Sequence, residues 1–424
     1  MQKQVNIGLL GLGTVGGGVF KVLKDNKAIN IKKIAVKDKT QVQQISGLNP
    51  DLLTEDAKVI VIDPEIDIIV EVIGGVSPAF EFVKIALESG KHVVTANKEL
   101  IAKKGEELFE IAKSNNALLL FEAAVGGGIP LIMPMKMSLS ANKYEKLAGI
   151  LNGTTNYILT KMDQEGADYE SVLKEAQELG YAEADPTGDV QGFDTAYKIA
   201  ILASIAFKKR INQEDIYREG IDELTPIEFA YADEFGYKIK LIALAQEAGS
   251  KLDVRVHPML VSKNHPLAHI NGVTNSLVIN AQPVNQVMFT GPGAGEMPTA
   301  SSVCADVLAI VSEIHTTNNL LPLMKCTHSQ KAEIIDIENS SNKYFIRIDA
   351  KDTPGVIGNI GTICAKHDIN LVKIVQKGVL ENGLANIVIL TGECVEKDLN
   401  TALEELAKTQ SIAQVHKVIR VMEL

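Results

Sequence analysis

The chain has 424 residues and a hydrophobic content of 46%, which predicts a globular protein of two or three domains. A net charge of −11 without a basic stripe argues against nucleic-acid binding. The sequence has no run of about eighteen apolar residues, so we predict no membrane span. Four scattered cysteines without a CxxC pair indicate reduced thiols and no zinc site. The first residues lack a signal-peptide pattern, so we predict a cytoplasmic protein.

The first third of the chain alternates strands with helices. Strands are expected at 4–10, 31–36, 67–73, 91–95 and 117–121, and helices from the first glycine loop to about 26, at 78–89 and at 101–114. This alternation predicts a parallel, doubly wound α/β sheet whose ligand lies at the carboxyl ends of the strands. We predict a Rossmann domain over 1–133, completed by a helix at about 298–315.

After residue 133 the pattern becomes α+β. Helices are expected at 169–179, 193–207 and 226–247, and strands at 251–258 and 276–280. We predict a substrate-binding, catalytic and dimerisation domain over 134–297, followed by a linker over 316–343.

The last part of the chain predicts a ferredoxin-like unit over 344–424. The expected elements are strands at 344–350, 370–377, 384–391 and 414–422, with helices at 356–367 and 396–408. This order is βαββαβ.

A glycine loop follows the first predicted strand and opens the first helix. Its sequence, Gly11-Leu-Gly13-Thr14-Val15-Gly16, fits the G-x-G-x-x-G pattern. The glycines permit a tight turn, close approach to a pyrophosphate and close helix packing, while the helix N-terminus faces the anion. In this context we predict a dinucleotide site, although the string alone also fits a turn that binds nothing.

The end of the second strand bears on the choice of cofactor. Lys37 can neutralise a ribose 2′-phosphate, whereas Asp38 can bind a 2′-hydroxyl. We favour NADP over NAD, and the alternative is that Lys37 and Lys39 belong to a solvated turn.

The stretch from Glu183 to Lys198 carries four carboxylates and one lysine. Asp194 and Lys198 are four residues apart where an apolar helix begins, so both side chains share one face. Apolar neighbours lower the pKa of a lysine and carboxylates raise it, and a lysine between these effects can carry a proton. Taken alone, the pair also fits an ordinary surface ion pair.

Three further motifs have both a functional and a structural interpretation. Thr95-Ala-Asn97-Lys98 ends a strand at the ligand edge, and its alternative is a helix cap. The glycine-rich loop from Glu122 to Pro130 can offer carbonyls to a hard cation, or it is an inter-domain turn. The segment Asn152-Gly-Thr-Thr-Asn156 can contact a substrate or cap a helix.

Taken together, these motifs strongly resemble homoserine dehydrogenase over roughly residues 4–315. The resemblance continues in Tyr217-Arg-Glu-Gly-Ile221 and in Gly293-Ala-Gly295, and residues 344–424 resemble an ACT domain through Asp352-Thr-Pro-Gly-Val. Without an aspartate kinase domain, the chain looks like the monofunctional form. The resemblance implies NAD(P)-dependent interconversion of L-homoserine and L-aspartate 4-semialdehyde, in threonine and methionine biosynthesis.

The resemblance also implies roles for individual residues. Lys198 exchanges the proton of the substrate oxygen, Lys98 lies between the nicotinamide and that oxygen, and Asp194 positions the substrate or Lys198. Glu183 holds the substrate amino group, and Asp189 and Lys98 are also implied to bind the substrate. The remaining implied contacts are Gly180 and Gly295 to the cofactor, and Glu122, Val125, Gly127 and Ile129 to a monovalent cation such as Na⁺, mainly through carbonyls. The run Gly16-Gly17-Gly18 is richer in glycine than the family usually shows, which puts the first helix in doubt.

Two other functions stay open at this point. Aspartate-semialdehyde dehydrogenase requires a cysteine nucleophile, and Cys304 lies in a predicted helix. A lapsed enzyme that only senses amino acids is disfavoured by the retained lysines and acids. For the C-terminal unit we expect an amino-acid effector, namely threonine, bound near Asp352 and Gly355, in a homodimer or homotetramer.

Overall fold

The computed structural model describes residues 4–42, 45–316, 326, 328–379 and 383–422. The chain divides into two compact units. Unit 1 comprises Met1–Leu147, Thr195–Ile216 and Thr274–Ala332, and unit 2 comprises Ala148–Asp194, Tyr217–Val273 and Glu333–Leu424. The division passes through strand β7 (Lys143–Ile150) and the start of helix α9 (Phe193–Phe207).

Unit 1 contains a parallel sheet of six strands in the order β3-β2-β1-β4-β5-β6. The strands are β1 (Val5–Leu10), β2 (Ile29–Ala35), β3 (Leu53–Thr54), β4 (Ile68–Glu71), β5 (His92–Thr95) and β6 (Leu119–Leu120). The central strand β4 is buried along its whole length, as expected when helices cover both faces of a parallel sheet. The strand order is that of a doubly wound dinucleotide-binding fold, so the predicted Rossmann class is confirmed.

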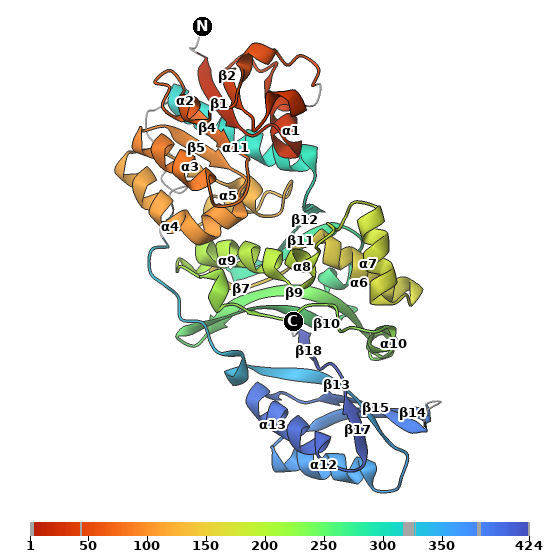
Figure 1. The fold of residues 1–424 in the computed structure, drawn as a ribbon. Coiled ribbons are helices and arrows are strands. Elements are labelled where there is room, and N and C mark those ends of the chain that lie inside the picture. Colours follow the sequence, from red (N-terminus) through yellow and green to blue (C-terminus); the bar gives the residue numbers. More distant parts are fainter. Residues whose placement is uncertain (1–3, 43–44, 317–325, 327, 380–382, 423–424) are drawn as a thin grey trace. The chain divides into compact units, whose positions relative to one another are not determined.

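Helices surround this sheet, and one of them comes from far along the sequence (Figure 1). The main helices of the unit are α1 (Thr14–Leu23), α2 (Lys58–Val61), α3 (Ala79–Glu88), α4 (Lys98–Ser114), α5 (Ile132–Lys136), most of α9 and α11 (Glu296–Thr316). Helix α11 packs on α1 so closely that a Cβ at Gly18 would lie 2.8 Å from the Cβ of Ala300. The extra glycine therefore makes room for α11, which explains the glycine-rich start of α1.

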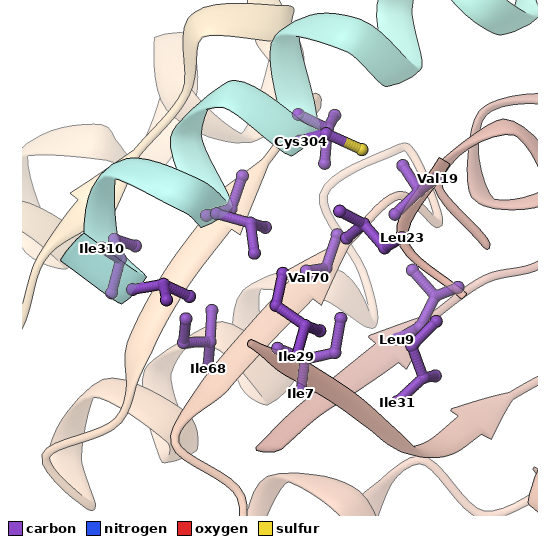
Figure 2. Packing of buried hydrophobic residues seen from close by; sticks show 14 of the residues in the cluster. Ile7, Leu9, Val19, Leu23, Ile29, Ile31, Ile68, Val70, Cys304 and Ile310 are labelled. Carbon is purple, nitrogen blue, oxygen red and sulfur yellow. The ribbon is translucent and has the colours of Figure 1, made fainter. Parts of the chain in front are cut away.

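Helix α11 is long and apolar enough to pass a test for a membrane-spanning segment. Its apolar side, which includes Val303, Cys304, Val307 and Ile310, instead belongs to the buried cluster around β1 and β4. Figure 2 shows Cys304 and Ile310 beside Ile68 and Val70 of the sheet. The helix is thus part of the core of unit 1.

Unit 2 is built on a long antiparallel pair of strands, β9 (Tyr237–Ala248) and β10 (Lys251–Ser262). The helices in its part before residue 273 include α6 (Gly153–Glu165), α7 (Tyr169–Glu178), α8 (Thr187–Val190) and α10 (Pro226–Glu234), and the short strand β8 (Tyr217–Arg218) pairs with β10. The next two strands along the chain, β11 (Thr274–Gln282) and β12 (Asn285–Pro292), form an antiparallel hairpin that belongs to unit 1.

The single helix predicted over 226–247 is wrong. The helix α10 ends at Glu234, Gly236 turns the chain with a φ of 86°, and β9 follows. Strand β9 is buried on both faces. One face carries Ile239, Leu241, Ala243 and Ala245, and the opposite face carries Ile242 and Leu244. Such a strand reads as a continuous apolar run, which periodicity alone does not distinguish from a buried helix.

The C-terminal part of unit 2 has the predicted βαββαβ order. Its elements are β13 (Ser341–Lys351), α12 (Val356–Lys366), β14 (Leu371–Val379), β15 (Leu384–Thr391), β16 (Cys394–Val395), α13 (Glu396–Ala407), β17 (Ile412–Val415) and β18 (Ile419–Met422). The predicted last strand, 414–422, is split, because β17 pairs with β13 whereas β18 also pairs with β10. Strand β18 therefore joins the ferredoxin-like unit to the β9–β10 pair within unit 2.

The compact units group the chain differently from the predicted domains, since Thr195–Ile216 and Thr274–Ala332 belong to unit 1. The predicted limits at 133, 297 and 343 stay predictions. Part of the predicted linker, 317–325 and 327, lies outside the described residues. Its described part includes a backbone bridge between Arg210 and Lys331.

Candidate active site

The glycine loop of unit 1 forms a cradle between β1 and α1. Gly11 has a φ of 102°, and a Cβ at Gly16 would lie 2.1 Å from the carbonyl oxygen of Gly11. Gly13, by contrast, is exposed and has no atom within 4 Å of a Cβ position. Gly11 and Gly16 therefore require glycine, while Gly13 leaves open space for a ligand.

The start of α1 suits an anion. Its N-cap, Gly13, has no side chain to cap the helix, and its first turn, which begins with Thr14 and Val15, carries no acidic residue. The first backbone N–H groups of a helix lack partners within it and carry partial positive charge. These residues fit the pyrophosphate of a dinucleotide.

A buried network that sequence reasoning missed ties the ends of β4 and β5 together. Glu71 is fully buried and accepts hydrogen bonds from Thr95 Oγ1 at 2.6 Å and from the backbone N–H of Ile73 at 2.8 Å. Burial raises the pKa of Glu71, against the effect of these donors. An acid at the end of an apolar strand was the available signal, but its partner is distant in sequence.

Asn97 continues this network into α4. Its Nδ2 donates to the carbonyl of Gly75 at 2.6 Å, and its Oδ1 accepts the N–H of Leu100 at 3.0 Å, which caps the helix. Lys98 is therefore the first residue of α4, directly beyond the carboxyl end of β5. The two interpretations of this motif are compatible, because Asn97 caps the helix while Lys98 begins it beyond the end of β5.

Lys37 is exposed just beyond the end of β2, the strand beside β1. Asp38 is engaged within its own turn, where its carboxylate accepts from the N–H and hydroxyl of Thr40 at 2.8 and 2.6 Å. It also accepts from Gln41 Nε2 at 2.8 Å, and these bonds lower the pKa of Asp38. Lys37 is therefore exposed beyond the strand, whereas the carboxylate of Asp38 is hydrogen-bonded within its own turn.

Lys98 and Lys198 both belong to unit 1 and lie near the starts of packed helices. Ile101 of α4 and Ile201 of α9 line one small cavity, each three residues beyond its lysine. Lys198 is buried, with an exposed fraction of 9%. Near the same ends, the ammonium of Lys103 lies 5.6 Å from the ring centre of Tyr197.

The acidic stretch is partly helical in the structure. Asp189 lies in α8 and Asp194 in the first turn of α9, on the same helix as Lys198. The amide of Asn152 donates to Asp189 Oδ1 at 2.7 Å and to Asp194 Oδ2 at 3.0 Å. These two acids are brought together, whereas Glu183 is exposed in the segment between α7 and α8.

The predicted cation loop uses its carboxylate elsewhere. Glu122 is buried and accepts from the N–H groups of Leu131, Ile132 and Met133 at 2.5, 2.8 and 2.6 Å. Burial raises the pKa of Glu122, which these donors counteract. The side chain thus fastens the start of α5, and a cation at this loop would be held by carbonyls.

The rest of this loop is held tightly within unit 1. Gly126 and Gly127 have φ values of 78° and 56°, and a Cβ at Gly127 would lie 2.5 Å from the carbonyl of Gly293. The carbonyl of Gly127 accepts the hydroxyl of Ser302 at 2.7 Å. Val125 and Ile129 are buried, and Gly295, with a φ of 115°, precedes α11. Gly180, exposed with a φ of 75°, follows α7 in unit 2.

The cysteines do not provide a nucleophile. Cys304 is in the core of unit 1, and burial raises the pKa of its thiol to about 12. Burial likewise raises the pKa of Cys394 to about 11. Because the thiolate is the reactive form, a cysteine-dependent aldehyde dehydrogenase is not supported.

A doubly wound domain with a glycine cradle, an α+β region and a ferredoxin-like C-terminal unit define a nicotinamide-dependent oxidoreductase with an ACT domain. Family models agree. Residues 11–122 match the NAD-binding domain of homoserine dehydrogenase, residues 130–308 match homoserine dehydrogenase, and residues 344–409 match the ACT domain.

Full-length relatives give the same result. Homoserine dehydrogenase of Synechocystis is 45% identical over 99% of both chains. The crystal structure of homoserine dehydrogenase from Thiobacillus denitrificans is 39% identical, covers 99% of both chains and superposes with a TM-score of 0.93. A hyperthermophilic archaeal homoserine dehydrogenase in complex with NADPH is 28% identical, covers 73% of this chain and 98% of its own, and has a TM-score of 0.63. The chain belongs to the homoserine dehydrogenase family.

Proposed function

We propose that the protein interconverts L-homoserine and L-aspartate 4-semialdehyde with NADP, using Lys198 as the proton carrier and Lys98 as an electrostatic partner. The supporting observation is that these lysines lie near the starts of two packed helices, with Lys98 at the ligand edge of the parallel sheet. Turnover of homoserine with NADP, followed by NADPH absorbance, tests the activity directly.

The proposed roles match what the reaction needs. Oxidation of a primary alcohol requires removal of its hydroxyl proton, and reduction of the aldehyde requires positive charge at oxygen and then a proton. When bound, the nicotinamide supplies the redox chemistry. Lys198 would move the proton at the substrate oxygen, and Lys98 would stabilise negative charge there.

The acids of unit 2 would recognise the amino-acid part of the substrate. Glu183 is exposed and available to an ammonium group, and Asp189 and Asp194 share the amide of Asn152. A carboxylate paired with an ammonium gives charge-assisted hydrogen bonds, which are stronger than neutral ones. We assign Glu183 and Asp189 to the substrate amino group and Asp194 to the placement of substrate or Lys198.

The glycine-rich loop from Glu122 to Pro130 is proposed to hold a monovalent cation such as Na⁺. Its candidate ligands are the carbonyls of Glu122, Val125, Gly127 and Ile129, because the Glu122 carboxylate already accepts three backbone N–H groups. A cation there would brace the loop that follows β6. No cluster of three acidic, histidine or cysteine side chains suited to a metal occurs in the described part of the chain.

Replacing Lys37 by alanine is expected to raise the Kd of NADPH by about tenfold or more and to leave that of NADH within about twofold. Only NADPH carries the 2′-phosphate, and a charge-assisted contact contributes about 1.5–3 kcal/mol. Fluorescence titration with both cofactors measures the effect, with Lys39→Ala as the matched control one residue beyond Asp38. Equal weakening for both cofactors would contradict the assignment.

The ACT domain is proposed to bind threonine and to inhibit the enzyme in a homo-oligomer. Asp352 is exposed before α12, and Gly355 caps that helix with a φ of 91°. These residues offer a carboxylate to an ammonium and backbone N–H groups to a carboxylate. A ligand regulates only through different affinities for two arrangements, with a coupling of typically about 1–3 kcal/mol.

Buried ion pairs link this domain to the rest of unit 2. Arg347 of β13 donates to Glu228 of α10 at 2.5 Å, and Arg420 of β18 donates to Glu219 at 2.7 Å. The backbone of Ile221, two residues beyond Glu219, donates to the carbonyl of Val190, which follows Asp189. These contacts offer a continuous physical connection from the ACT domain to a proposed substrate-binding acid.

Asp352→Asn is expected to weaken threonine inhibition by about tenfold and to leave turnover without threonine unchanged. The substitution removes the carboxylate charge that would pair with the threonine ammonium, so it weakens threonine binding and has no effect on turnover when threonine is absent. Inhibition curves and calorimetry with threonine measure this, with Asp368→Asn as a control beyond α12. A point change is preferable to truncation before Tyr344, because truncation would leave the buried Glu228 without Arg347. Absence of threonine binding to the unmodified protein would refute the effector assignment.

A further inference from the structure

The side-chain amide of Asn152 forms hydrogen bonds through both its oxygen and its nitrogen. The residue is 5% exposed and precedes α6. Its Oδ1 accepts the backbone N–H of Thr155 at 2.8 Å and the Thr155 hydroxyl at 2.9 Å, which caps the helix. Because the amide is planar, an oxygen that faces the helix turns the nitrogen away from it, and the cap determines the orientation of the group.

The nitrogen side of this amide is fully used by carboxylates. An amide nitrogen has two N–H donors. Asn152 Nδ2 donates to Asp189 Oδ1 at 2.7 Å and to Asp194 Oδ2 at 3.0 Å, so one group holds acids from α8 and α9. Two carboxylates beside each other repel and raise each other's pKa, and a shared donor relieves this.

The helix that carries Asn152 is itself well anchored within unit 2. Asn156, one turn further along α6, donates to the carbonyls of Ile270 and Gly272 at 3.2 and 2.9 Å. The buried Lys240 of β9 donates to Asn156 Oδ1 at 3.3 Å and to the carbonyl of Ile270 at 2.6 Å. The end of α6 is therefore a fixed support and not a freely moving cap.

We infer that Asn152 is a positioning residue for the reaction, whose amide holds Asp189 and Asp194 in their working places. The inference rests on the proposed roles of those two acids. It adds that the α6 cap is the device that aims the donor, so capping and substrate recognition depend on the same side chain. A 1 Å displacement of positioning groups costs up to about a hundredfold in rate.

Two substitutions separate this role from capping alone. Asn152→Ser and Asn152→Asp both keep an oxygen that caps the helix, since serine and aspartate are among the best N-cap residues. Both remove the amide donor, and the aspartate also adds a third negative charge. We expect kcat/KM for homoserine to fall by about a hundredfold in Asn152→Ser and further in Asn152→Asp, with an increased KM. The Kd of NADPH should stay near the unmodified value in both variants, and the melting temperature should stay near it in Asn152→Ser.

Matched controls account for the cap and for the charge. Asp168→Ser changes the N-cap of the neighbouring helix α7, where Asp168 Oδ1 accepts the N–H of Ser171 at 3.0 Å. Gln164→Glu adds one negative charge at an exposed site of α6. Both should keep kcat/KM within about twofold, as expected for surface changes.

The outcomes separate the inference from the function on which it rests. Near-normal kinetics in both Asn152 variants, or a loss explained by a lowered melting temperature, overturns the inference. Asp189→Asn and Asp194→Asn are measured in parallel. If these two variants keep normal kinetics, the proposed roles of the acids fail. If they lose activity while the Asn152 variants do not, only the positioning role fails.

Discussion

Replacing Lys198 by methionine is expected to lower kcat by about a hundredfold or more while the Kd of NADPH stays nearly unchanged. Lys198 is buried, and methionine fills a similar volume, so the substitution removes the ammonium without opening a large cavity. The loss should appear in kcat and in kcat/KM together, because a proton carrier acts in the transition state.

Steady-state kinetics in both directions, together with NADPH titration, test this expectation. Lys103→Met is the matched control, since Lys103 lies near the same helix ends and packs over Tyr197. The control should keep kcat within about twofold. Turnover close to that of the unmodified enzyme in Lys198→Met would sink the assignment of Lys198 as the proton carrier.

Arg420→Met is expected to reduce the free energy of unfolding by about 3–5 kcal/mol at neutral pH, the usual cost of leaving buried charges without a partner. Arg420 donates through Nε to Glu396 at 2.8 Å and through Nη1 to Glu219 at 2.7 Å, and all three side chains are largely buried. Denaturant unfolding measures the effect. Lys366→Met, which breaks the surface pair of Lys366 with Glu405, should cost less than about 1 kcal/mol.

The difference between the Arg420 variant and the unmodified protein should narrow as the pH falls. Burial alone would raise the pKa of Glu219, but the charge of Arg420, together with His257, Lys417 and the hydrogen bond from Tyr217, outweighs burial and holds this pKa at about 2. The stabilisation from a lowered carboxyl pKa is complete above the unfolded value, roughly 4.3, and is lost as the pH falls toward the folded value. Without Arg420, burial should instead raise the pKa of Glu219, so mild acid favours the folded variant. An unchanged difference between pH 7 and pH 4 would contradict this explanation.

Local sequence patterns predicted most of the longer elements of the parallel-sheet domain, together with helix α9 and the element order of the C-terminal unit. The glycine loop predicted its own conformation, because Gly11 needs a positive φ and Gly16 has no room for a side chain. The helix expected at 193–207 has the observed limits, since its apolar residues continue without a break to Phe207. The βαββαβ order of the C-terminal unit followed from regular alternation and clear turn residues.

The same reasoning failed where burial on both sides erased periodicity or where partners were distant. Strand β9 was wrongly predicted as a helix because its middle is a continuous apolar run, without the alternation of apolar and polar residues that marks a strand. The split between β17 and β18 depends on pairing with β10, which no local pattern reveals. The carboxylate of Glu122, in the loop where a carbonyl cation site stays a prediction, accepts hydrogen bonds from backbone groups nine to eleven residues ahead, and no local pattern revealed these partners.

The sequence by itself determined the family, the order of the elements and the residue types available for chemistry, because glycine requirements, helix periodicity and motif spacing are local properties. The tertiary structure decided which of these groups meet. Asn152 reaches Asp194 across 42 positions, Glu71 meets Thr95 across 24, and Arg420 meets Glu219 across 201. A buried polar group must find its partner wherever the fold places one, so the cost of leaving it unpaired is set by packing and cannot be read from its neighbours in the chain.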